Sequence, residues 1–128
     1  MPLKRVSCQS SKSLEEFYGE MEASKDSVSA STGLGMLDLL PMLTEFCKPL
    51  EVWGLTSLSH LWLLPSDAPS QWLVSITSFA VGYRIQYRMT DAEAPWRDAF
   101  VEGHAIDAAE ACRLILIAIK RSGGWVEA

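Results

Sequence analysis

Histidine and cysteine are scarce in this chain of 128 residues, which contains two of the former and three of the latter. The cysteines, Cys8, Cys47 and Cys112, are odd in number and widely spaced, with no CxxC or CxxH pair among them. A disulfide framework or a zinc site needs more numerous and more closely spaced residues of these types. We therefore expect no disulfide and no metal ligands, and a reducing compartment such as the cytoplasm.

Long hydrophobic runs and an excess of positive charge are also missing. The longest uninterrupted apolar run extends from Leu114 to Ile119, whereas a membrane-spanning helix needs ~20 residues, and the N-terminus lacks the apolar stretch of a signal peptide. Eleven Lys and Arg face sixteen Asp and Glu, giving a formal net charge of −5. Binding to phosphate backbones or anionic lipids requires clustered basic residues. The sequence thus predicts a cytoplasmic, acidic protein that binds neither nucleic acid nor membrane, and whose macromolecular partner, if it has one, is basic.

The remaining composition is typical of one folded domain, here expected to span residues 1–128. Residues 1–12 are predicted to form a polar arm with a short edge strand near Leu3–Val6. Residues 24–35 are rich in serine and glycine, which predicts a flexible loop. Gly33 and Gly35 within it resemble part of a dinucleotide-binding fingerprint, but no strand precedes them and the third glycine is missing. We interpret this segment as a hinge.

Three segments repeat apolar residues at helical spacing. The first helix is predicted to begin after Ser13, which starts a capping box. The second covers roughly residues 36–48, and Pro41 inside it predicts either a kink or the first turn of a new helix. The third is predicted to follow an N-cap at Asp107 and to end at Gly123.

Between these helices the apolar period changes to two, which is typical of strands. Tyr83–Met89 alternates most clearly and is predicted to form an antiparallel hairpin with residues 71–79, with further strands within 57–64 and 99–105. The fold class is therefore predicted to be α+β with two layers: an antiparallel sheet of three or four strands, two N-terminal helices and one C-terminal helix. The residues expected to share one core are Trp72, Ile76, Ile85, Tyr87, Leu114, Ile115 and Ile119.

No established catalytic motif occurs in the sequence, which lacks the serine-hydrolase, zinc-protease, phosphate-loop and calcium-loop patterns. His60 lies in an apolar strand and Cys47 in an apolar helix, and no neighbour in sequence completes a nucleophile–base arrangement with either. We predict no catalytic residue and no cofactor. A small enzyme that uses Cys47 and His60 stays open as an alternative.

Two segments carry side chains that are typical of protein interfaces. One is the acidic stretch after the Tyr83–Met89 strand, which contains a tryptophan whose alternative role is to pack at the edge of the core. The other is the polar face of that strand, because arginine is enriched at interfaces and binds carboxylates through two hydrogen bonds. The predicted partner-binding residues are Asp91, Glu93, Trp96, Asp98, Glu102, Arg84 and Arg88.

Several short segments, together with the small size and the acidity, resemble small bacterial toxin-immunity proteins of contact-dependent inhibition and polymorphic toxin systems. The segments are VWGLTS at 52–57, WLV at 72–74, YRIQY at 83–87, APW at 94–96 and SGGW at 122–125. The resemblance covers roughly residues 50–125 and implies a cytoplasmic protein without activity of its own, which neutralises a cognate toxin by occluding it.

We therefore hypothesise a non-catalytic inhibitory protein that functions in bacterial competition and binds a basic toxin domain. An oligomerising accessory domain, for example a homodimer that covers apolar surface, is the second alternative.

Overall fold

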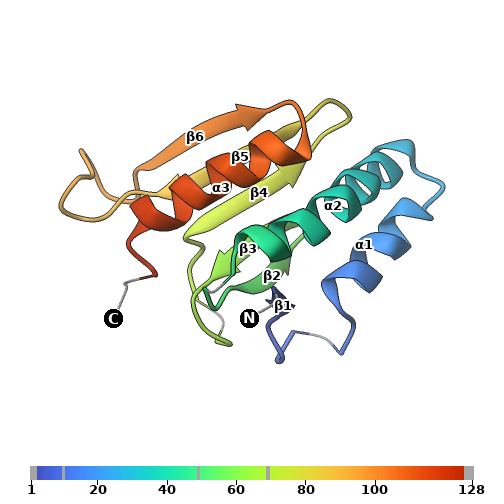
Figure 1. Ribbon diagram of the computed structural model, residues 1–128, viewed down its shortest axis with the longest axis horizontal. Coiled ribbons are helices and arrows are strands. Elements are labelled where there is room, and N and C mark those ends of the chain that lie inside the picture. Colours follow the sequence, from blue (N-terminus) through green and yellow to red (C-terminus); the bar gives the residue numbers. More distant parts are fainter. Residues whose placement is uncertain (1–2, 10, 49, 69, 126–128) are drawn as a thin grey trace.

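The computed structural model describes residues 3–9, 11–48, 50–68 and 70–125 (Figure 1). The expected domain from 1 to 128 and arm from 1 to 12 lie partly outside these residues. The elements follow in the order β1 (Lys4–Arg5), α1 (Leu14–Glu22), α2 (Ser27–Phe46), β2 (Trp53–Ser57), β3 (His60–Leu64), β4 (Val74–Ser78), β5 (Tyr83–Arg88), β6 (Phe100–Ala105) and α3 (Ala108–Ser122). In the part of the chain that is described, no helix is long and apolar enough to span a membrane.

The strands form one six-stranded mixed sheet whose spatial order, β1-β2-β3-β4-β5-β6, is also their order along the chain. The α+β class is as predicted, but the expected sheet of three or four antiparallel strands is too small, and β1 pairs with β2 in parallel. Residues 57–64 do not form one strand, because a turn at Leu58 and Ser59 separates β2 from β3. The predicted edge strand near Leu3–Val6 is present as the two residues of β1.

All three helices lie on one face of the sheet (Figure 1). Helix α3 packs on β4, β5 and β6, α2 packs on β4 and α3, and α1 packs on α2. Side chains alternate across a strand, so Leu61, Ile76 and Ile85 point into the core beneath the helices. Within the described ranges, the opposite face of the sheet carries no helix (Figure 1).

The predicted core is confirmed for six of its seven residues. Ile76, Ile85, Ile115 and Ile119 are buried in one cluster, and Tyr87 and Leu114 pack against it from partly buried positions. Trp72 was assigned to the wrong face.

Trp72 precedes β4, and bends at Gln71 and Leu73 interrupt the alternation that the sequence pattern assumed. Its ring packs edge-on against Phe100, with the ring centroids 5.9 Å apart, on the helix-free face of the sheet. Trp72 therefore belongs to the open surface and not to the core.

The flexible loop expected over residues 24–35 is also wrong, because α2 begins at Ser27. Asp26 caps it by accepting a hydrogen bond from the Ser29 N–H, at 3.0 Å. Serine and glycine have low helix propensity, but packing against the rest of the fold overrides that preference. Thr32 and Gly33 are buried, and Gly33 lies so close to the backbone of α1 that a side chain there would clash with it.

Helix α2 continues through Pro41 as one element, so no new helix starts at that residue. Pro41 is exposed, on the side of α2 that turns away from the core. Its missing N–H therefore leaves a carbonyl that water can reach and does not create a buried unsatisfied group.

The predicted start of α1 and both predicted ends of α3 are confirmed. Ser13 and Glu16 form a complete capping box at the start of α1. Asp107 caps α3 by accepting from the Glu110 N–H, and Gly123 ends α3 in the left-handed conformation with a φ of 77°. These local signals act over three or four residues, which is why the sequence alone shows them.

Candidate functional site

The connection between β5 and β6 is a loop that closes on itself through its backbone. The Met89 N–H donates to the Ala99 carbonyl at 3.0 Å, and the Glu93 N–H donates to the Thr90 carbonyl at 3.1 Å. Trp96 lies on this loop and is 73% exposed. It therefore does not pack at the edge of the core, which was the alternative role considered for it.

Asp98 connects the loop to the sheet. It adopts a φ of 63°, which Asp tolerates better than most residues, and its carboxylate accepts from Arg88 Nη1 at 2.9 Å. Arg88 also donates from Nε to the Trp72 carbonyl at 3.1 Å, and its guanidinium lies 4.9 Å from the Trp72 ring centroid. With only 19% of its side chain exposed, Arg88 is engaged inside the chain and anchors the loop.

Asp91 and Glu93 differ from Asp98 in having no such partner. Both side chains are exposed, and neither forms an ion pair or a side-chain hydrogen bond with any residue that the structure describes. Their carboxylates are thus free to meet a positive charge from outside. Together with Trp96 they define the anchor loop, by which we mean residues 90–98.

The helix-free face of the sheet continues directly from the anchor loop. The strand pairing from β2 to β6 aligns the side chains of this face in rows that cross the sheet. One row contains Ser57, His60, Thr77, Arg84 and His104. The next row contains Leu55, Trp62, Ser75, Gln86 and Glu102. Gln86 Nε2 donates to Glu102 Oε1 at 2.7 Å, and Glu102 Oε2 lies 2.9 Å from His104 Nε2.

These contacts keep the pKa of Glu102 below its usual range, chiefly through the hydrogen bond from Gln86. Arg88 lies on β5 and pairs with Asp98 of the acidic loop. Through this pair the two predicted surfaces, the acidic loop and the arginine-bearing strand, form one continuous surface. The row pairing also adds Trp62 and His60 to it, which the sequence analysis did not select for binding.

The side chains of Cys47 and His60 lie on opposite sides of the sheet and are not in contact. Cys47 follows α2 and is buried in the core, where burial, and then the proximity of Cys112, raise the pKa of its thiol to about 11. His60 lies on the helix-free face, with Nδ1 2.6 Å from Thr77 Oγ1. Burial, and then the Arg84 charge, lower the pKa of His60, so the ring is neutral at pH 7. A protonated thiol on one side of the sheet and an imidazole on the other do not make a nucleophile–base pair.

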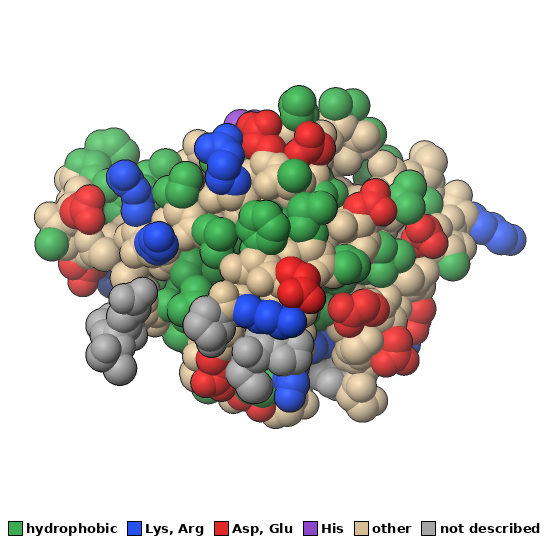
Figure 2. All heavy atoms as spheres, viewed as in Figure 1, with side chains coloured by type: hydrophobic (Ala, Val, Ile, Leu, Met, Phe, Trp, Pro, Cys, Tyr) green, Lys and Arg blue, Asp and Glu red, His purple; other side chains and the backbone are tan. Residues whose placement is uncertain are grey.

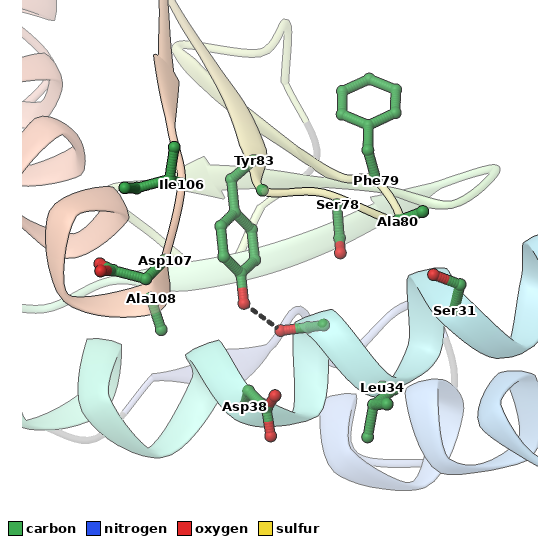
Figure 3. Close-up of a pocket in the computed structure, with 12 residues that line it drawn as sticks. Ser31, Leu34, Asp38, Ser78, Phe79, Ala80, Tyr83, Ile106, Asp107 and Ala108 are labelled. Atoms are coloured by element: carbon green, nitrogen blue, oxygen red, sulfur yellow. Dashed lines mark hydrogen bonds between the residues drawn. The ribbon is translucent and has the colours of Figure 1, made fainter.

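A cavity of about 300 Å³ lies between α2, the β4–β5 turn and the start of α3 (Figure 3). Asp38 of α2 and Asp107, the N-cap of α3, are among the residues that line it, and the Tyr83 hydroxyl donates to the Gly35 carbonyl at 2.6 Å. Asp107 is already engaged in capping α3, and burial raises the pKa of Tyr83, which keeps its hydroxyl protonated. The cavity therefore offers acceptors for a small cationic or hydroxylated group but no activated base.

The lining residues of this cavity were not selected from the sequence, because they come from three segments that share no motif. Among the residues described, no cluster of three or more His, Cys, Asp or Glu could hold a metal ion.

Charge on the helix-covered side is divided between its two ends. Acidic side chains gather over α1 and the adjoining part of α2, whereas Lys and Arg gather near the C-terminal end of α3 (Figure 2). Four glutamates of α1 account for much of the first group, and Lys120 and Arg121 belong to the second.

No protein family, curated protein or solved structure was found to match this chain.

Proposed function

We propose that this protein is a non-catalytic binding protein that holds a basic protein partner against the anchor loop. The observation that supports this most strongly is the exposed Trp96 on a loop closed by its own hydrogen bonds. Tryptophan gives a large contact area and loses little side-chain entropy when it binds, which makes it a frequent energetic centre of interfaces. A loop that is already ordered before binding also loses less conformational entropy on association than a flexible loop would.

The charges around Trp96 favour a basic partner. Asp91 and Glu93 lie on the same loop without internal partners, and the chain as a whole carries a net charge of −5. Opposite charge accelerates encounter between proteins and fixes their orientation. The engaged pair of Arg88 and Asp98 serves in this scheme as the foundation of the loop, and Arg84 and Glu102 border the contact on the sheet.

The specific form that we propose is an immunity protein, acting in the cytoplasm, that neutralises a cognate bacterial toxin by covering a basic surface of it. Three features support this form: the resemblance of residues 50–125 to such proteins, the acidity of the chain, and an anchor suited to occlusion. The alternative of a small enzyme that uses Cys47 and His60 gains no support from the geometry, since the sheet separates the two side chains.

Reversing the free charges of the anchor loop should slow association. In the variant Asp91→Lys/Glu93→Lys, we expect the association rate constant to fall about tenfold at low salt and to depend less on salt concentration. The measurement is surface-based binding kinetics against the purified product of the neighbouring reading frame, paired with protection of growth in cells that express that product.

The matched control for the charge reversal is Glu15→Lys/Glu22→Lys. It makes the same change in net charge on exposed positions of α1, far along the chain from the loop, and should associate nearly as fast as the wild type. Equal slowing by both double variants would mean that net charge alone matters and that the loop is not the contact. Absence of binding by the wild type, without growth protection, would overturn the immunity proposal.

Replacing Trp96 by alanine should change the dissociation rate constant of the complex and not the association rate constant. Losing an anchor costs about 2 kcal/mol or more of binding free energy, so the dissociation rate constant should rise about thirtyfold while association changes little. The melting temperature should not change, because the side chain is exposed. A lower melting temperature with an unchanged dissociation rate would assign Trp96 to the fold instead of the interface.

A further inference from the structure

We infer that two copies of this chain associate through the free edge of β6 and the side of α3 that lies above it. The anchor loop takes no part in this interface, and of the residues that border the proposed partner contact only Glu102 lies in it. It begins from the two edges of the sheet, which are unlike each other. The edge at β1 is two residues long and carries Lys4 and Arg5, as protected edges commonly do. The edge at β6 is six residues long and contains neither lysine nor proline.

The backbone groups that β6 directs outward follow from its pairing with β5. The Met89 N–H donates to the Ala99 carbonyl, and hydrogen-bonded pairs alternate along an antiparallel ladder. Tyr87 with Val101 and Ile85 with Gly103 are therefore hydrogen-bonded pairs in the observed register. It follows that Phe100, Glu102 and His104 point their N–H and C=O groups away from β5. In the described residues no strand pairs with that edge.

Apolar surface flanks this edge on its helix side. A cavity of about 250 Å³ lies between β6 and α3, and its lining includes Val101, Leu114 and Ile117. Ile117 is 42% exposed, and Val101 is exposed as well. A strand that pairs with β6 would place its own side chains over this cavity. This is the binding mode known as β-strand addition, in which a free sheet edge accepts another strand.

The side chains of β6 are complementary to those of a second, antiparallel β6. With a two-fold axis at Gly103, Glu102 of each copy lies opposite His104 of the other, and both residues belong to the set with outward backbone groups. An imidazole can donate a hydrogen bond to a carboxylate across such a pair, whereas like charges directly opposite each other are unfavourable. The alternative register, with the axis at Glu102, would place two carboxylates opposite each other.

Helix α3 is complementary to itself across the same axis. Glu110, Leu114, Ile117 and Arg121 are spaced four, three and four residues apart, so they share one side of the helix. Leu114 lies over Gly103: a Cβ added at Gly103 would be 3.5 Å from Leu114 Cδ1. Because the proposed axis passes at Gly103, the two copies of α3 would pass each other near Leu114.

Because α3 and its copy are antiparallel, the end with Glu110 faces the end with Arg121, with Leu114 and Ile117 between them. A two-fold dimer requires this kind of self-complementary patch. The occupant of the β6 edge is therefore a second copy of the chain.

Analytical ultracentrifugation over a wide concentration range tests this interface. The wild type should show a dimer of twice the 14.2 kDa chain mass. Glu110→Arg and Arg121→Glu should each raise the dimer dissociation constant about tenfold, because each places like charges together twice. The combined variant should return to within about threefold of the wild type, since it restores the pairing with the charges exchanged.

Arg113→Glu is the matched control. It makes the same charge change as Arg121→Glu on an exposed residue of α3 that does not line the cavity, and it should leave the dissociation constant unchanged. His104→Pro removes an outward N–H that β5 does not use, and should abolish the dimer while the melting temperature of the monomer is retained.

A monomer at every concentration, or a dimer that none of the charge exchanges weakens, would overturn the inference. The Asp91→Lys/Glu93→Lys variant should still form the dimer. Failure of partner binding and failure of dimerisation are thus distinguishable.

Discussion

Gly33→Ala should lower the free energy of unfolding by about 3 kcal/mol, at the upper end of what overpacking costs. A Cβ at this position would lie 2.4 Å from the Glu22 backbone nitrogen and 2.6 Å from the Tyr18 carbonyl oxygen. Both atoms belong to the backbone of α1, so no side-chain rotation can relieve the clash. The helix α1 would have to move away from α2, and with it the buried side chains of Leu14 and Tyr18. Denaturant unfolding followed by circular dichroism measures the loss.

Gly19→Ala is the control for this substitution. Gly19 lies inside α1, and no heavy atom comes within 4 Å of an added Cβ. Because alanine has the higher helix propensity, this variant should be stabilised by about 0.5–1 kcal/mol. Equal stability of the two variants would show that α1 and α2 do not cross at the distance described.

Ile115→Ala should cost about 2–5 kcal/mol of unfolding free energy, the range for truncating a large side chain in a core that cannot collapse around the cavity. Ile115 is completely buried, in the same cluster as Ile76 and Ile85. The control Ile106→Ala removes the same atoms just before α3 from a side chain that is 77% exposed, and should cost less than about 0.5 kcal/mol. A loss below that value for Ile115 would mean that another side of α3 faces the sheet.

Helix α3 was predictable because its signals are local. Its N-cap, its left-handed C-cap and its apolar stripe all lie between Asp107 and Gly123, and each was found where the pattern indicated. The first half of α2 was not predictable in this way. Ser27 to Gly35 looks like a loop by propensity, and the segment is helical because its small residues allow close contact with α1 and with Ser78. That contact depends on residues far away in sequence.

The sheet illustrates the same division between local and distant information. The hairpin of β4 and β5 follows from alternation alone, and the structure bears it out. A short edge strand near Leu3–Val6 was predicted and is present as β1, but its parallel partner was not. Lys4 and Arg5 align with Trp53 and Gly54, which lie far away in sequence, and no pattern within residues 1–12 can indicate that pairing. Trp72 was misassigned because a bend shifts the alternation by a residue, and a one-residue shift exchanges the two faces of a strand.

The candidate site was partly visible in the sequence. An acidic stretch with a tryptophan is a compositional signal, and the exposure of Trp96 agrees with it. The union of this stretch with the arginine-bearing face of β5 was not visible. It depends on the ion pair between Asp98 and Arg88, two residues ten apart in sequence, and on the positive φ of Asp98 where the loop returns to the sheet.

The strand order has a consequence for how quickly the chain finds its structure. Since β2 to β6 lie side by side in the order in which they occur, each new pairing closes only the short connection to the strand before it. Closing short loops costs little entropy, and chains dominated by such contacts fold fast. The pairing of β1 with β2 is different, because it must wait for the whole stretch from Arg5 to Trp53 to be brought together, including both N-terminal helices. The slow event in folding is therefore expected to be the docking of the N-terminal segment onto a meander that has already formed.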